Sequence, residues 1–328
     1  MSELPETAEL LAGAHVLALP MRQRFRGIEV REVMVLRGPQ GWTEFSPFVE
    51  YDDAESAAWL AAAIDFGWKA APAPLRDRIP VNATLPAVPA DRVAEVLARF
   101  PGCRTVKVKV AEPGQALADD VARVAAARTA LGPEGRIRLD ANGGWNVDEA
   151  EHAVHALAPF DLEYLEQPCA SVAELAELRE RIGYLGIPVA ADESVRKADD
   201  PLAVARAGAA DLLVIKAQPL GGIHRALGIV RQAGLPVNVS SALETSIGIA
   251  MGAHLAAALP ELPYDCGLAT VALFERDIAA DPLLPVDGAI PVRRPEPDAR
   301  ALTGLAASPE RDAWWRDRLR RCRELLET

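Results

Sequence analysis

Short apolar runs alternate with Ala-rich segments of helical spacing over most of the chain. Eight such runs recur between residues 81 and 270, each followed by a turn signal. A repeated strand–helix–strand order is typical of βα units on a parallel sheet, and eight units predict a (β/α)8-type barrel. The runs are VNATLPA (81–87), TVKVKVA (105–111), RIRLDAN (136–142), LEYLEQP (162–168), IPVAADES (187–194), DLLVIKA (211–217), LPVNVSS (235–241) and, less clearly, YDCGLAT (264–270).

The segments on either side of the barrel have other patterns. Residues 28–36 alternate apolar and polar side chains, and a glycine turn leads to a second strand in 42–48, which together predict a hairpin. Residues 53–66 have helical spacing after an aspartate start. The tail from about residue 272 is Pro-rich and ends in an amphipathic helix. We expect Trp315, Leu319, Cys322 and Leu326 to pack inward and the arginines of that helix to remain in water.

Composition and charge narrow the class of protein. Half of the 328 residues are hydrophobic, a quarter are charged, and the formal net charge is −12. An acidic chain is a poor partner for nucleic acid or for an anionic membrane surface. The four cysteines are scattered, and no apolar stretch reaches membrane-spanning length. We therefore expect a soluble cytoplasmic protein, and the sequence leaves monomer and homo-oligomer open.

Charged residues lie at the ends of five consecutive predicted strands. Lys107 and Lys109 share one face of their strand because side chains alternate with period two. The later strand ends carry Asp140, Glu166, Asp192 and Lys216, each 24 to 31 residues after the one before. The carboxyl ends of barrel strands meet at one mouth, where active sites of this architecture lie. One lysine alone would suggest a solvated face and one aspartate alone a helix cap, but the joint pattern predicts a site.

The pattern suits proton abstraction beside a divalent cation. Three carboxylates around one point repel one another unless a cation joins them, and all-oxygen ligation favours Mg2+, with Mn2+ as the alternative. Asp140, Glu166 and Asp192 are the predicted ligands. We predict that the charge of Lys107, together with burial, lowers the pKa of Lys109, so that Lys109 serves as a base. No nucleophile motif such as G-x-S-x-G is present.

These residues and motifs resemble the enolase superfamily, and within it the muconate-lactonizing subgroup. The similarity rests on KVKV, RLDAN, EYLEQP, VAADES and VIK, and enolase-type sites use a lysine or histidine base with Mg2+. It implies a (β/α)7β modified TIM barrel over residues 79–271, an N-terminal α+β capping domain over 1–78, and a C-terminal segment, 272–328, that packs back on the capping domain.

Further motifs are similar to the actinobacterial o-succinylbenzoate synthase family. They include GWTEFSPFVEY, LEQPCA, QPLGGI, SSALETSIG and LPYDCGLAT. This resemblance implies a carbon–oxygen lyase of menaquinone biosynthesis that dehydrates 2-succinyl-6-hydroxy-2,4-cyclohexadiene-1-carboxylate to o-succinylbenzoate through a metal-stabilised enediolate. It assigns proton abstraction to Lys109 and a stabilising cation on the opposite face to Lys216.

The resemblance also implies which residues contact a small carboxylate substrate. The loop at 21–28 is expected to cover the mouth, with Arg26 facing the anion. The other expected contacts are Asn142 and the ends of the last two strands, namely Ser240, Ser241, Gly267 and Leu268. A turn role for Asn142 and a helix-cap role for the two serines are the alternatives.

Other functions remain open at this point. N-Succinylamino acid racemase, dipeptide epimerase and muconate cycloisomerase would share the metal ligands and both lysines. A barrel that only binds a carboxylate is the alternative outside the enzymes, but a degraded site would be expected to lose one of these residues.

Overall fold

The N-terminal part of the chain forms a three-stranded antiparallel sheet. The structure is a computed structural model that describes residues 4–196 and 200–327. In it, β1 (His15–Phe25) pairs with β2 (Ile28–Gly38), and β2 pairs with β3 (Gly41–Phe45). Helix α2 (Asp53–Trp68) follows, and the Asp52 side chain caps it by accepting the Glu55 N–H. The predicted hairpin and helix are therefore confirmed.

Seven parallel strands form a second sheet in the order of the sequence. They are β5 (Ala83–Leu85), β6 (Thr105–Lys109), β7 (Arg136–Asp140), β8 (Leu162–Glu166), β9 (Val189–Ala191), β10 (Leu212–Ile215) and β11 (Val237–Val239). Two bridges join the edges of this sheet through one further segment, because Cys266 pairs with Val81 and Gly267 pairs with Ser240, both in parallel. Residues 266–267 thus take the place of the eighth strand and close the barrel, which confirms the predicted (β/α)7β architecture.

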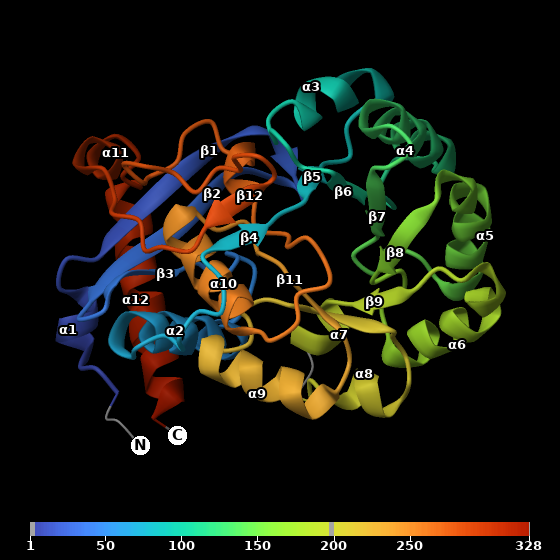
Figure 1. Ribbon diagram of the computed structural model, residues 1–328. Coiled ribbons are helices and arrows are strands. Elements are labelled where there is room, and N and C mark those ends of the chain that lie inside the picture. The colour runs from blue at the N-terminus through green and yellow to red at the C-terminus, as the bar shows by residue number, and fades with distance from the viewer. Residues whose placement is uncertain (1–3, 197–199, 328) are drawn as a thin grey trace.

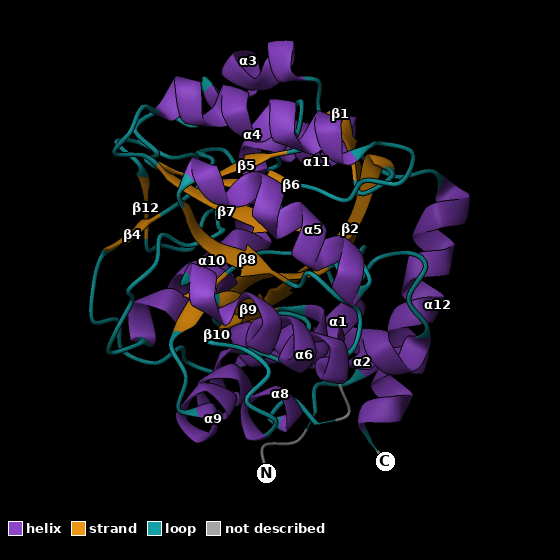
Figure 2. Cartoon of the chain, turned by 90° about the vertical axis from the view of Figure 1, so that its right-hand side faces the viewer, coloured by secondary structure: helices purple, strands orange, loops and turns teal. Residues whose placement is uncertain are grey.

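Helices cover the outside of the barrel (Figures 1 and 2). The longer ones are α4 (Leu117–Leu131), α5 (Val147–Leu157), α6 (Val172–Ile182), α9 (Ile223–Ala233) and α10 (Ser246–Ala258). Shorter helices are α1 (Thr7–Leu11), α3 (Val93–Leu97), α7 (Glu193–Arg196), α8 (Ala203–Arg206) and α11 (Ala299–Gly304), with 3-10 turns at Ala90–Arg92, Ala158–Phe160, Gly183–Leu185 and Thr270–Leu273. Figure 2 shows α4, α5 and α6 in front of the strands that they follow. No helix in the described ranges is both long and apolar enough to cross a membrane.

The C-terminal segment returns to the N-terminal sheet. Strand β12 (Ala289–Pro291) pairs with β4 (Arg78–Pro80), and α12 (Pro309–Leu326) lies against α2 and β1 (Figure 1). A separate apolar cluster joins the N-terminal sheet, α2 and α12. Exact domain boundaries at residues 78 and 271 stay a prediction.

Two expectations about these segments were wrong. The stretch 21–28 is no loop but the tip of the β1–β2 hairpin, where Phe25 pairs with Ile28 across a two-residue turn. The arginines of α12 do not all face water, because Arg318 is buried and its guanidinium donates to the Phe48 carbonyl at 3.0 Å and the Ser56 hydroxyl at 2.6 Å. Helical spacing alone gave no sign of these carbonyl and hydroxyl acceptors, which come from a different part of the chain.

Candidate active site

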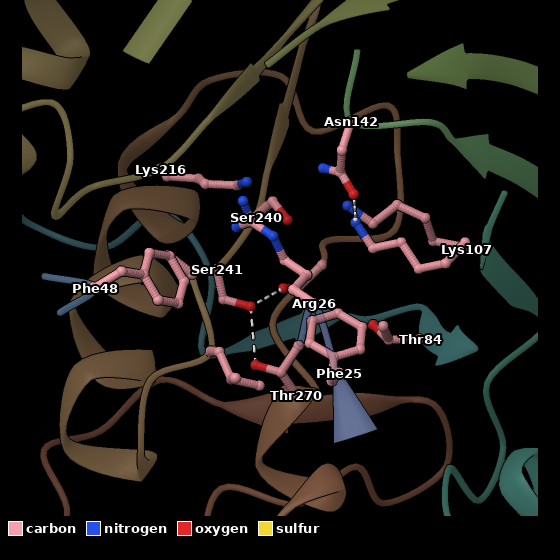
Figure 3. Close-up of a pocket in the computed structure, with 14 residues that line it drawn as sticks. Phe25, Arg26, Phe48, Thr84, Lys107, Asn142, Lys216, Ser240, Ser241 and Thr270 are labelled. Carbon is pink, nitrogen blue, oxygen red and sulfur yellow. Dashed lines mark hydrogen bonds between the residues drawn. The ribbon is translucent and has the colours of Figure 1, made fainter. Parts of the chain in front are cut away.

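A pocket lies at the carboxyl end of the barrel strands, under the tip of the β1–β2 hairpin. Figure 3 shows Lys216 and Asn142 on opposite sides of it and Phe25 and Arg26 reaching in from the hairpin. Its walls come from the N-terminal part of the chain and from the barrel. The lining residues are Phe25, Arg26, Phe48, Thr84, Lys107, Lys109, Asn142, Lys216, Ser240, Ser241, Ala242, Leu243, Gly267 and Thr270.

The two lysines of β6 reach the same side of the barrel and share Asp140, but each also has a partner of its own. Lys107 Nζ donates to Glu166 Oε1 at 2.9 Å and lies 3.1 Å from Asp140 Oδ2. Lys109 Nζ donates to Asp140 Oδ2 at 2.5 Å and to Asn142 Oδ1 at 2.6 Å. Both lysines are buried. The period of the strand therefore places two ammonium groups side by side, and Lys109 is the one beside the substrate-binding residues expected at the mouth.

The surroundings shift the pKa values of the two lysines in opposite directions. Burial lowers the pKa of Lys109, and the charges of Lys107 and Arg26 lower it further, against the opposing effect of Asp140. Burial alone would lower the pKa of Lys107, but the Glu166 and Asp140 carboxylates outweigh it and raise that pKa well above its usual value. The lowering at Lys109 has the direction that the sequence predicted.

Strand register brings the three predicted metal ligands to neighbouring positions. Lys109 pairs with Asp140, Asp140 with Glu166, and Glu166 with Ala190, which is two residues before Asp192. All three carboxylates are buried. Asp192 accepts a hydrogen bond from Lys216 Nζ at 2.5 Å and another from Arg196 Nε at 3.1 Å.

Charges of both signs near these carboxyl groups shift their pKa values. Burial and the Asp140 and Asp192 carboxylates raise the pKa of Glu166 to about 7, although Lys107 opposes this shift. Burial would raise the pKa of Asp140 and Asp192 too, but lysine neighbours outweigh it and hold both well below the usual range. The three carboxylates are thus near enough to repel one another, and lysines now balance them.

The donor set fits a hard divalent cation, although the oxygens do not converge on one point. In the described ranges, no group of three or more His, Cys, Asp or Glu side chains is gathered closely enough to hold a metal ion. The reason is visible in the contacts above, because each carboxylate turns to a lysine or an arginine. Buried, mutually repelling carboxylates on adjacent strand ends are the ligands that Mg2+ prefers. An ion would replace the ammonium groups as their partner.

The hairpin tip and the last strands supply the rest of the pocket. Arg26 has a left-handed backbone, with φ of 51°, and its guanidinium lies 5.0 Å from the centre of the Phe48 ring. Ser241 Oγ donates to the Gly267 carbonyl at 2.6 Å, while Thr245 and not either serine caps the following helix. Ser240 and Gly267 both line the pocket.

Leu268 was expected to line the pocket, but it is not among the residues that do. A Cβ on Gly252 of α10 would lie 2.6 Å from Leu268 Cδ2, so the leucine packs outward against that helix. Successive residues of an extended segment face opposite sides, and Gly267 takes the inward side.

Several residues that hold the site together were not predicted from the sequence. Gln167 has a left-handed backbone and is buried, and its Oε1 accepts the N–H groups of Asp192 at 2.9 Å and Ser194 at 3.1 Å. It therefore ties the end of β8 to the end of β9. Phe25, Phe48 and Thr84 were missed because nothing in their local pattern separates a pocket wall from a core.

Comparison with known proteins gives consistent matches. Residues 90–312 match the family described as enolase C-terminal domain-like, and residues 16–67 match the enolase N-terminal domain-like family. The o-succinylbenzoate synthase of Mycolicibacterium smegmatis is 56% identical over 324 residues, which is 98% of this chain and 99% of that protein.

Solved structures match the fold at lower sequence identity. Muconate lactonizing enzyme from Pseudomonas putida has a TM-score of 0.72 and 21% identity, with 90% of this chain and 98% of that chain covered. The N-succinyl Arg/Lys racemase from Bacillus cereus has a TM-score of 0.73 and 20% identity, with 90% and 96% covered. At these identities the likeness shows the fold and no particular reaction.

Proposed function

Because the chain belongs to the o-succinylbenzoate synthase family of the enolase superfamily, we propose that it dehydrates 2-succinyl-6-hydroxy-2,4-cyclohexadiene-1-carboxylate to o-succinylbenzoate in menaquinone biosynthesis. It is a carbon–oxygen lyase. The observation that carries the proposed reaction is the 56% identity to an o-succinylbenzoate synthase over 98% of this chain. Two buried lysines, Lys109 and Lys216, in the wall of one pocket that the hairpin tip covers support it. We place this step in the cytoplasm, in keeping with four cysteines that are all free thiols.

Lys109 is the proposed base. Its neutral amine takes the proton from the ring carbon α to the carboxylate, and the electron pair of that C–H bond moves toward the carboxylate. The ammonium form of Lys109 then gives a proton to the departing hydroxide on the same face of the ring, the C–O bond breaks, and water leaves as the ring becomes aromatic. The lowered pKa of Lys109 favours the neutral amine that starts this sequence.

Lys216 and Arg26 are proposed to bind and orient the anion. Lys216 comes from the strand end after β10 and presents a cation on another side of the pocket. Arg26, held over Phe48 by the hairpin, covers the mouth and excludes water. Asn142, Ser240, Ser241 and Gly267 complete the proposed contacts with the substrate.

Asp140, Glu166 and Asp192 are proposed to hold a divalent ion. Enolase-superfamily sites use such an ion, and the all-oxygen donor set favours Mg2+, with Mn2+ as the alternative. When bound, the ion supplies positive charge beside the substrate carboxylate while the α-proton is removed. A divalent ion and a substrate with two carboxylates together add no net charge to the site. This suits a buried site in which lysines already balance the charge of the carboxylates.

Racemisation or epimerisation of an N-succinyl amino acid or a dipeptide is the second candidate. The observation in its favour is the same pair of lysines, because two bases on two sides of one carbon allow proton exchange in both directions. Solved structures of similar fold include an N-succinyl Arg/Lys racemase and an L-Ala-D/L-Glu epimerase.

A direct comparison of substrates tests the proposal. The purified chain is given the cyclohexadiene carboxylate, N-succinyl amino acids and dipeptides, each with Mg2+ and with EDTA. We expect o-succinylbenzoate to form only with the metal, at a kcat/KM at least about 100-fold above that for the other substrates. A higher kcat/KM for an amino acid derivative would replace the first candidate by the second. Turnover that persists in EDTA would contradict the proposed requirement for a metal ion.

A further inference from the structure

We propose that Glu193, the first residue of α7, is a positioning residue that turns the Asn142 amide toward the amine of Lys109. The inference rests on the proposed function, because it concerns the same base. Glu193 follows Asp192 directly in the chain and accepts a hydrogen bond from Asn142. Glu193 is not one of the proposed metal ligands, and its proposed role is toward the base.

A chain of hydrogen bonds links Glu193 to Lys109. Asn142 Nδ2 donates to Glu193 Oε1 at 3.2 Å, and Asn142 Oδ1 accepts from Lys109 Nζ at 2.6 Å. The backbone of Asn142 is fixed separately, with φ of 48° and an N–H that donates to Asp140 Oδ1 at 3.1 Å. Only the side-chain amide is left to be oriented.

The chemistry of a carboxylate decides that orientation. An ionised carboxylate only accepts hydrogen bonds, so Glu193 must face the NH2 group of Asn142. The amide oxygen then faces Lys109. A neutral amine has two N–H bonds and one lone pair, and an acceptor at Asn142 takes one N–H bond and turns the lone pair elsewhere. A reversed amide would point its own N–H groups at Lys109 and remove this control.

Glu193 is itself held in place by Arg196, which is buried. Arg196 Nη2 donates to Glu193 Oε1 at 2.7 Å, its Nε donates to Asp192 Oδ1 at 3.1 Å, and its Nη1 donates to the Tyr51 hydroxyl at 3.2 Å. One guanidinium thus fixes a predicted metal ligand and Glu193 together. Tyr51 comes from the N-terminal part of the chain, so this part and the barrel together hold Arg196 in place.

The second oxygen of Glu193 indicates a role other than stability. Among the described residues, Glu193 Oε2 is buried and has no hydrogen-bond partner. A buried acceptor without a partner lowers stability, so a residue present only for stability would be better replaced by one with fewer polar atoms. The bond to Asn142 gives a reason for a carboxylate here.

A double-mutant cycle tests the inference with the full chain in saturating Mg2+. The variants are Glu193→Gln, Asn142→Ala and the double variant, and Glu134→Gln, at an exposed position, is the matched control. We expect Glu193→Gln to lower kcat about tenfold, since glutamine accepts either orientation of the amide. KM and Mg2+ affinity should change by less than about twofold, and the isotope effect with α-deuterated substrate should rise.

The double variant separates positioning from general support. If Glu193 acts through Asn142, the double variant has the kcat of Asn142→Ala alone. A further tenfold loss in the double variant, or a wild-type kcat in Glu193→Gln, would overturn the inference. Glu193→Asp keeps the negative charge beside Arg196 but shortens the side chain, which draws the carboxylate away from Asn142. This variant replaces Glu193→Gln in the test if Glu193→Gln does not fold. A folded Glu193→Asp variant with wild-type kcat also overturns the inference.

The test remains informative if the proposed reaction is wrong. Absence of o-succinylbenzoate formation by the wild-type chain would refute the proposed function alone. The same cycle is then run on exchange of the α-proton of an N-succinyl amino acid with solvent. Additive losses there would refute the role of Glu193 separately.

Discussion

The ammonium group of Lys107 contacts both carboxylate oxygens of Glu166, at 2.9 Å and 3.1 Å. Both side chains are buried, and the two residues come from β6 and β8, with β7 between them. Lys107 therefore acts as the counter-cation of a predicted metal ligand. A bound metal would compete for the same oxygens, which makes the effect of Lys107 on stability depend on the metal.

Lys107→Met should destabilise the chain most strongly without metal. In EDTA, we expect the free energy of unfolding to fall by about 3 kcal/mol, because the buried Glu166 loses its partner. In saturating Mg2+ the loss should be smaller, because the ion takes over that carboxylate. Urea unfolding with and without the metal measures both values. Lys69→Met, at a half-exposed lysine, is the control, and equal losses in the two conditions would contradict the prediction.

Lys109→Ala should abolish dehydration while leaving metal binding intact. The amine supplies the base, so kcat should fall by roughly 10³-fold or more. Asp140, Glu166 and Asp192 remain, and calorimetric titration with Mg2+ should show an affinity within a few-fold of wild type. Turnover retained in this variant would contradict the role of Lys109. Lys216→Ala is the companion variant, which should keep solvent exchange of a proton on the Lys109 face.

Asp192→Asn should weaken metal binding. The change removes one negative charge from the predicted ligands and replaces one of the two oxygens that accept from Lys216 and Arg196 by an NH2 group. We expect Mg2+ affinity to fall by about 100-fold, with a matching rise in the Mg2+ concentration needed for half-maximal turnover. Asp148→Asn, at an exposed aspartate, is the control. An unchanged Mg2+ titration would remove Asp192 from the proposed metal site.

Glu44→Ala should loosen the contact between the N-terminal sheet and the barrel. Glu44 on β3 accepts the N–H groups of Thr245 at 3.2 Å and Gly248 at 3.1 Å, at the start of α10. Removing this buried acceptor leaves helix N–H groups unpaired, so the free energy of unfolding should fall by about 3 kcal/mol. Glu44→Gln keeps one acceptor and should give an intermediate loss. A thermal scan in which both variants match wild type would contradict the prediction.

His254 should make stability depend on pH. Burial lowers the pKa of His254, and the charge of Arg294 lowers it further, although the ring donates from Nδ1 to the Ala250 carbonyl at 2.8 Å. The unfolded chain therefore takes up the proton first as the pH falls. The contribution of neutral His254 to the free energy of unfolding is complete above pH 6.5, the ordinary pKa of a histidine. It is lost as the pH falls from there toward the lower pKa of the folded state.

Replacement of His254 isolates this effect. Asparagine at this position keeps a donor for Ala250 but does not titrate. Urea unfolding in EDTA at pH 7.5 and 5.5 should show a larger loss of unfolding free energy for wild type than for His254→Asn. Identical pH dependence in the two chains would show that His254 does not titrate differently on unfolding.

The barrel and the positions of its charged residues could be predicted from the amino-acid order alone. Alternation along β6 puts Lys107 and Lys109 on one face, whatever the rest of the chain does, because the period of a strand is two. The end of a strand can likewise be read from where an apolar run stops, as at Asp140 and Glu166. Parallel strands in sequential order then bring those ends to one edge of the barrel.

The contacts between groups from distant segments could not be predicted in this way, because they depend on how the chain packs. Arg26 covers the pocket because its hairpin tip lies over a barrel built from later residues, and Arg318 is buried because carbonyl groups from the chain around residue 50 surround it. Glu193 meets Asn142 across 51 residues. Local patterns fix the face on which a side chain lies, but its partner depends on contacts between distant segments, and these form only when the chain packs.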